Sequence, residues 1–145
     1  MPLITKDVQS EGFMQDDNAA FIAADNLAGN TAPNGLHVDI DVETDVKSLG
    51  KDLPRISVIR IPFDKFTDGR GFSLARQLRE LGFSGRIRAC GHLVSDQFAF
   101  ILQCGFDEVE IDAVMAERQP VAYWQEAAAV NYGYRSKLAQ RSATS

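Results

Sequence analysis

The sequence predicts an α/β fold of about four mostly parallel strands with βαβ crossovers, forming an open sheet or a half-barrel. From residue 35 onward, strand-like and helix-like segments alternate, which is the order expected of parallel strands joined by helices. The segment 55–63 is rich in β-branched residues, as buried parallel strands are. Four strands are too few for a closed eight-stranded barrel. A half-barrel would leave an apolar edge, and this favours a homodimer.

The N-terminal third of the chain shows less regular patterns than the rest. Residues 1–34 are polar and rich in turn formers, which predicts an irregular N-terminal arm or, as an alternative, a small β-rich lead-in around Phe21 and Ile22. "LHVDIDV", residues 36–42, alternates apolar and polar side chains and predicts a half-buried strand. Residues 43–50 are expected to form one or two turns of helix. We therefore predict a single α/β domain over residues 35–135, followed by a frayed tail over residues 136–145.

A helix after the strand 55–63 is predicted by an apolar stripe at Leu74, Leu78 and Leu81. Gly82 stands where a glycine commonly ends a helix. The remaining predictions are a strand at 85–91, a helix at 92–106, a strand at 107–112 and helical residues 113–130 divided at Pro120.

Composition excludes several classes of protein. The 145-residue chain has no apolar run near the roughly 20 residues that span a bilayer and no secretory signal pattern, so we expect a cytoplasmic protein with no membrane contact. Cys90 and Cys104 form no CxxC pair, and His37 and His92 lack the spacing of a metal site. Without a GxGxxG fingerprint or clustered cysteines, the sequence predicts no metal and no cofactor.

Charge is distributed unevenly along the chain. The net charge of −5 argues against nucleic-acid binding. Residues 1–53 carry a net −7 and residues 89–145 a net −3, whereas residues 54–88 carry 8 basic and 3 acidic residues, a net +5. This positive third either attracts a small anion or an acidic protein partner, or is simply a solvated helix face.

Polar side chains gather where the predicted parallel strands end. Ligands of α/β proteins bind at the carboxyl ends of the strands, where three loops would meet. The side chains expected at this rim are Asp64, Lys65, Thr67, Asp68, Arg70, His92 and Asp112.

The stretch "TDGRG" places Arg70 between two glycines at the start of the helix. The guanidinium of Arg70 and the backbone N–H groups of Gly71, Phe72 and Ser73 would together suit an oxyanion such as sulfite, sulfate or phosphate. The alternative is structural: Asp68 caps the turn or pairs with Arg70, and the glycines adopt positive φ.

Two further groups enter the candidate site. His92 precedes Asp96 by four residues, and such a pair either shuttles protons or is ordinary polarity at a helix start. Cys90 at a strand end would be a nucleophile only if its pKa fell. The predicted anion-binding or partner-binding residues are Asp68, Gly69, Arg70, Gly71, Ser73, Arg76, His92 and Asp96.

"FTDGRGFSLARQLRELGFSGRIRACG" followed by "DQFAFILQCGFDEVE" resembles a family of small bacterial proteins of unknown function encoded beside assimilatory sulfite reductase. The resemblance covers about residues 55–112. The matching residues are Phe66, Asp68, Gly69, Arg70, Gly71, Arg76, Asp96, Gln97, Cys104, Gly105, Phe106 and Asp107. The chain departs from the pattern at His92, usually acidic in the family, and at Ser95, often arginine there.

The resemblance implies an accessory role in sulfate assimilation, as a non-catalytic partner of sulfite reductase or of its electron donor. Although members are often labelled oxidoreductases, the sequence carries no recognisable site for a redox cofactor. Two alternatives remain: a small oxyanion-binding enzyme or sensor that uses the Arg70 turn, and a structural subunit whose motif serves only folding.

Overall fold

A computed structural model of the chain describes residues 1–16, 19–63 and 69–129. The described residues form one mixed sheet, mostly parallel and not closed, with the strand order β2-β1-β7-β6-β5-β4-β3. Its strands are β1 (Pro2–Thr5), β2 (Met14–Gln15), β3 (Ile22–Ala23), β4 (Leu36–Asp39), β5 (Ile56–Phe63), β6 (Arg86–Gly91) and β7 (Glu108–Glu110). The helices are α1 (Val8–Glu11), α2 (Arg70–Glu80), α3 (Phe98–Gln103) and α4 (Ala113–Arg118), and residues 121–129 are also helical.

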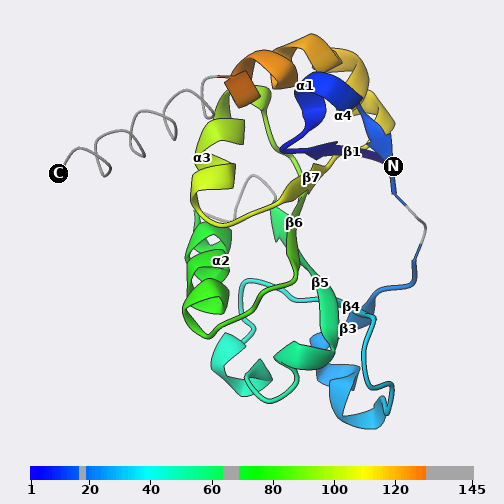
Figure 1. Cartoon of the computed structure of the whole chain (residues 1–145), viewed down its shortest axis with the longest axis vertical. Coiled ribbons are helices and arrows are strands. Elements are labelled where there is room, and N and C mark those ends of the chain that lie inside the picture. The colour runs from blue at the N-terminus through cyan, green and yellow to red at the C-terminus, as the bar shows by residue number, and fades with distance from the viewer. Residues whose placement is uncertain (17–18, 64–68, 130–145) are drawn as a thin grey trace, which may run out of the picture.

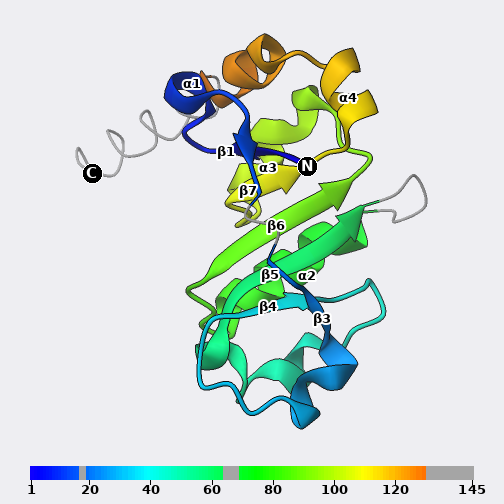
Figure 2. The same ribbon diagram turned by 90° about the vertical axis from the view of Figure 1, so that its right-hand side faces the viewer.

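Strands β3 to β7 run parallel and confirm the α/β class. Helices α2 and α3 connect β5 to β6 and β6 to β7, and both lie on the same side of the sheet (Figure 1). Among the described residues, no helix covers the central strands on the opposite face, as the view turned by 90° shows (Figure 2). The described part of the molecule is therefore an open sheet with helices packed on one face.

The expected strand count was too low because the N-terminal residues contribute strands. Residues 1–34 contain β1, β2 and β3 where an irregular arm was predicted, and β3 lies at the alternative lead-in predicted around Phe21 and Ile22. Strand β1 pairs antiparallel with β7, with Leu3 opposite Glu110 and Ile4 opposite Val109. Strand β1 has only four residues, and its partner lies about a hundred residues away in the sequence. So short a segment shows too little alternation of apolar and polar residues for a strand to be recognised. The predicted tail, residues 136–145, lies outside the described residues.

Two predicted helical segments contain 3₁₀ turns. The one or two turns expected within residues 43–50 form as the 3₁₀ helix Val46–Leu49, which Asp45 caps by accepting a hydrogen bond from the Lys47 N–H. The predicted helix 92–106 consists of a 3₁₀ turn, Ser95–Gln97, followed by α3. The buried Gln119 side chain causes this late start, because its amide binds the Leu93 carbonyl and the Ser95 N–H at 3.0 and 2.6 Å.

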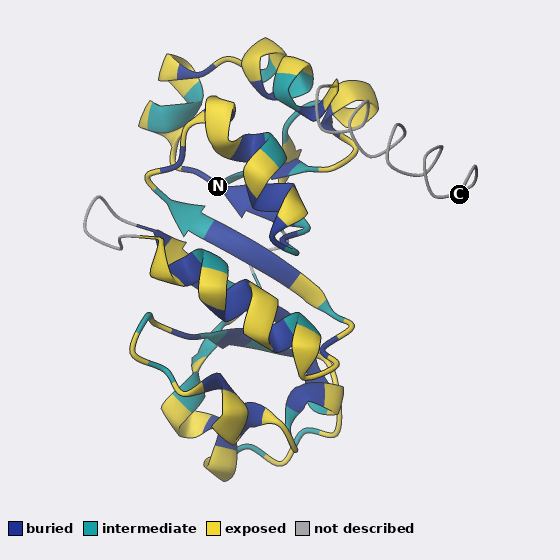
Figure 3. Cartoon of the chain, turned by 90° about the vertical axis from the view of Figure 1, so that its left-hand side faces the viewer, coloured by how far each residue is buried: buried dark blue, intermediate teal, exposed yellow. Residues whose placement is uncertain are grey.

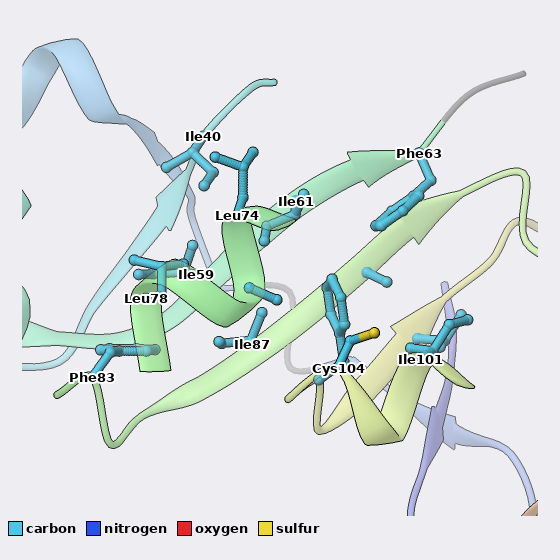
Figure 4. Packing of buried hydrophobic residues seen from close by; sticks show 14 of the residues in the cluster. Ile40, Ile59, Ile61, Phe63, Leu74, Leu78, Phe83, Ile87, Ile101 and Cys104 are labelled. Atoms are coloured by element: carbon cyan, nitrogen blue, oxygen red, sulfur yellow. The ribbon is translucent and has the colours of Figure 1, made fainter. Parts of the chain in front are cut away.

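The core lies between the sheet and α2. Ile59, Ile61 and Phe63 of β5 alternate onto the helical side, where they join Leu74 and Leu78 in one buried cluster (Figure 4). The same helix exposes its other side, so buried and exposed residues form stripes along it (Figure 3). Burying each large aliphatic side chain contributes about 1.5–3 kcal/mol, so this interface fixes the position of α2 over β5 and β6.

The helical residues 121–129 close the end of the molecule near α1. Trp124 is fully buried, packs edge-on against Phe98 with ring centroids 5.5 Å apart, and donates its indole N–H to the Gln119 carbonyl. Gln125 donates to the Val8 carbonyl of α1 at 3.0 Å, which joins the two ends of the described chain. Within the described ranges, no helix is both long and apolar enough to cross a bilayer.

Candidate functional site

The face of the sheet away from α2 and α3 carries charged side chains on its central strands. Asp39, Arg60 and Arg88 project from β4, β5 and β6, and Glu108 and Glu110 project from β7. These residues alternate along the strands with the apolar residues that face the helices. Because successive side chains of a strand point to opposite faces of the sheet, the charged residues lie on one face and the core residues on the other.

Arg88 is the centre of this cluster and is 1% exposed. Its Nε donates to Glu108 and its Nη1 donates to Glu110, each at 2.9 Å. Arg86 forms a second ion pair with Glu108, at 3.3 Å. Burying charges is costly, and each of these is compensated by an oppositely charged neighbour.

Arg60 extends the cluster toward β4. Its Nε and Nη2 donate to the two carboxylate oxygens of Asp39 at 2.6 and 2.8 Å, and its Nη1 lies 3.3 Å from a Glu110 oxygen. The Phe21 ring covers the guanidinium, with 3.8 Å between Cζ and the ring centroid. The hydrogen bond with Asp39 is the main cause that raises the pKa of Arg60 above its ordinary value.

Cys90 lies beside this cluster at the carboxyl end of β6. Its thiol donates to Glu110 Oε2 at 3.2 Å. Burial is the largest cause, and this hydrogen bond the next, of a pKa raised to about 12. The thiolate is the nucleophilic form, so Cys90 stays protonated and unreactive at neutral pH.

A pocket of about 450 Å³ opens next to these groups, lined by Met1, Asp39, Ile40, Arg60, Pro62, Cys90 and Glu110. It lies at the carboxyl ends of parallel strands, where the sequence predicted a site, but with different residues. The ion pairs join three guanidinium groups (Arg60, Arg86 and Arg88) and three carboxylates (Asp39, Glu108 and Glu110), so the cluster is electrically neutral. Its charges are directed at one another rather than at a ligand.

The predicted Arg70 turn has a different character. Gly69 adopts a left-handed conformation with φ of 78°, and Arg70 is the first residue of α2. The Arg70 side chain is 52% exposed and lies 3.2 Å from a carboxylate oxygen of Glu43, which is 79% exposed. This surface pair contributes little stability. Asp68, the predicted partner of Arg70, lies outside the described residues, as do Asp64, Lys65 and Thr67.

The second glycine of the motif is required by packing. A Cβ atom at Gly71 would lie 2.4 Å from the Phe63 ring, so α2 approaches β5 more closely than a side chain would allow. The position of Gly71 therefore has a structural explanation that needs no ligand.

The other predicted residues do not converge on Arg70. His92 is exposed and its backbone N–H donates to the Phe63 carbonyl at 2.9 Å. No hydrogen bond or ion pair within the described part of the chain joins His92 to Asp96. Asp96 instead lines another pocket of about 430 Å³ with Ser95, Ala99, Tyr123, Glu126 and Ala127. Asp112 caps α4 by accepting a hydrogen bond from the Met115 N–H.

Ser73 and Arg76 both lie on the exposed side of α2. Arg76 reaches toward α3, where its Nη2 lies 3.7 Å from the Cys104 sulfur. The positive third of the sequence is therefore divided in space, with Arg60, Arg86 and Arg88 on one face of the sheet and Arg70 and Arg76 on the helical face.

The charged cluster was missed in the sequence, although it left a signal. Arg60 interrupts an otherwise apolar strand, and Arg88 and Glu110 occupy the same face of the neighbouring strands. Charged residues at alternate positions of buried strands indicate paired charges on the second face.

This architecture defines an α/β protein with one helical layer and a charge-neutral cluster on the opposite sheet face. The chain belongs to the family described as "Bacterial protein of unknown function (DUF934)", whose model matches residues 37–144. That match confirms the expectation of a bacterial family of unknown function. Neither the search of the curated proteins nor the search of the solved structures found a match.

Proposed function

We propose that this protein is a non-catalytic accessory protein of assimilatory sulfite reduction, acting in the cytoplasm as a partner of sulfite reductase or of its electron donor. The observation that supports a non-catalytic role is that the polar groups of the pocket at the carboxyl ends of the strands are bound to one another. Arg60 donates hydrogen bonds to Asp39 and Glu110, and the Cys90 thiol has its pKa raised to about 12 and is not a nucleophile. We therefore place the contact with other molecules on the exposed side of the helical face.

The link to sulfite reduction rests on the resemblance of the segment around "FTDGRGF" and "LQCGFDEVE" to proteins encoded beside the reductase. The described part of that segment presents Arg70, Ser73 and Arg76 on the exposed side of α2. Exposed arginines are frequent in protein interfaces, which supports binding through this helix.

Affinity purification from cells grown on sulfate tests the proposal. We expect the tagged full-length protein to retain sulfite reductase or its electron donor, and deletion of the gene to slow growth on sulfate but not on cysteine. If neither protein is retained and the deletion strain grows normally on sulfate, the proposed function is wrong.

A second candidate is an oxyanion-binding enzyme or sensor at the Arg70 turn. The exposed guanidinium at the first residue of α2 favours it, and the Glu43 carboxylate at 3.2 Å competes with any anion there. Calorimetry with sulfite, sulfate and phosphate distinguishes the two candidates: binding that Arg70→Ala abolishes would favour the oxyanion site, and no binding by the wild type would exclude it.

A further inference from the structure

Four phenylalanines form a continuous series of tilted and edge-on ring contacts from the core to the surface of the helical layer. Phe63 and Phe106 are 5% and 3% exposed, and their ring centroids are 5.6 Å apart. Phe72 of α2 packs on Phe63 at 4.9 Å, and Phe100 of α3 packs edge-on against Phe72 at 4.8 Å. Phe100 is the outermost ring of this series and has 46% of its surface exposed. This outermost ring is therefore held in place by rings that the core fixes.

One helical turn further along, a second contact crosses between the same two helices. Arg76 follows Phe72 by four residues and Cys104 follows Phe100 by four, so the two pairs lie side by side. The Arg76 Nη2 donates to the Cys104 sulfur at 3.7 Å, and sulfur is a weak acceptor. Among the ion pairs of the described residues, none includes Arg76.

The other arginines of α2 are engaged. Arg70 pairs with Glu43, and Arg79 donates to the carbonyls of Phe83, Gly85 and Gly105 and to Asp107. Arg76 is thus the cation of this helix whose hydrogen-bonding capacity is least used within the described structure. It lies beside the half-buried Phe72 and the exposed Phe100, in a chain of net charge −5.

We propose that Phe72, Phe100 and Arg76 form a docking surface for a protein partner that presents a carboxylate next to an apolar side chain. The aromatic pair takes the apolar side chain, and the guanidinium binds the carboxylate bidentately. Rigid aromatics beside an arginine are the residue types that dominate the binding energy of protein interfaces. A nucleic acid would need several phosphate-binding cations, and this surface offers one. The inference rests on the proposed function for the identity of the partner.

The experiment measures binding of the full-length protein to two probes, sulfite reductase and its electron donor, by biolayer interferometry. Phe100→Ser and Arg76→Gln are compared with matched controls on α4, Val114→Ser and Arg118→Gln, since Val114 is 56% exposed and Arg118 is also exposed. We expect Phe100→Ser to weaken binding at least about tenfold and Arg76→Gln about fivefold, with the controls within about twofold of wild type. Thermal melts verify that all four variants are folded.

The outcomes separate the two proposals. If Phe100→Ser and Arg76→Gln bind a probe as tightly as the controls do, the docking surface is wrong and the proposed function stands. If the wild type binds neither probe, the proposed function fails and the inference fails with it. Sedimentation velocity tests whether a second copy of the chain occupies this surface. A wild-type dimer that the Phe100→Ser substitution dissociates would show that it does, and would overturn the proposal.

Discussion

Gly91, the last residue of β6, lies so close to the backbone of β5 that any side chain at this position would clash with it. Its φ is 123°, and a Cβ atom there would lie 2.1 Å from the Phe63 carbonyl oxygen. The Phe63 carbonyl also accepts a hydrogen bond from the His92 N–H, so the pairing of β5 with β6 fixes the start of the loop that leads to α3. A single residue thus determines how β5 and β6 meet at the strand-end rim.

We predict that Gly91→Ala lowers the free energy of unfolding by about 3 kcal/mol, since the methyl group clashes with backbone and the φ is unfavourable for alanine. Gly35→Ala is the matched control, because its φ is 76° but nothing lies within 4 Å of a Cβ there. It measures the cost of a left-handed φ without a clash, about 1 kcal/mol. Urea unfolding measures both, and equal losses would show that the close contact with Phe63 carries no cost.

Cys90 links stability to pH. Its pKa is raised from 9.0 to about 12 in the folded protein. The unfolded chain therefore loses the thiol proton first, and the stability that Cys90 contributes is complete below about pH 9 and is lost as pH rises toward 12, by up to about 1.4 kcal/mol per pH unit.

Unfolding free energies measured between about pH 8 and pH 10.5 test this linkage. We expect wild-type stability to fall more steeply with rising pH than that of Cys90→Ala, because the variant lacks the titrating thiol while the other alkaline groups are shared. Parallel curves for the two proteins would contradict the raised pKa.

At the scale of elements, local patterns located some segments and missed others. Strand β5 and helix α2 were predicted because β-branched residues and the leucine stripe each mark their own structure. Strand β1 was missed because it is stabilised by β7, at the other end of the sequence. The late start of α3 was also hidden, since the cause is the distant Gln119. Contacts between remote residues decide such cases, and a single sequence does not display them.

The side chain of Gln119, the residue that follows α4, joins this end of the helix to the loop before α3, and its removal has a predictable cost. Gln119→Leu leaves the Leu93 carbonyl and the Ser95 N–H buried without this partner, so we expect a loss of about 2–4 kcal/mol of unfolding free energy. Gln103→Leu makes the same chemical change at an exposed position of α3 and should change stability by less than about 0.5 kcal/mol. Denaturant unfolding gives both values, and similar small effects would mean that the loop does not depend on Gln119.

At the scale of the whole molecule, the sequence analysis predicted polar groups at the carboxyl ends of the strands, and the buried charged cluster was not among them. Arg70 and His92 were identifiable as polar residues after strands, and both are exposed there. The cluster around Arg88 was not identifiable from the sequence, because each of its members is an isolated charge along the chain. The register of β5, β6 and β7 brings these charges together on one face of the sheet. Charge pairing across a sheet is a property of the assembled molecule.

Net charge and local charge act in opposite directions on a partner that carries a net negative charge besides the carboxylate that Arg76 would bind. The whole molecule, with a net charge of −5, repels such a partner at long range, while Arg76 attracts it at contact. Screening acts first on the longer-range term, since the Debye length falls from about 30 Å at 0.01 M salt to about 10 Å at 0.1 M and about 3 Å at 1 M.

We therefore predict that affinity for the partner rises between about 0.01 and 0.1 M salt, as repulsion is screened, and falls toward about 1 M, as the contact with Arg76 is weakened. Arg76→Gln should keep the rise and flatten the fall, whereas Arg118→Gln should leave both limbs in place. Binding titrations across this salt range measure the profile. An affinity that falls steadily from the lowest salt would show that the positive charge of α2, and not the net charge of the chain, dominates at every distance, and would contradict this account of the molecule's field.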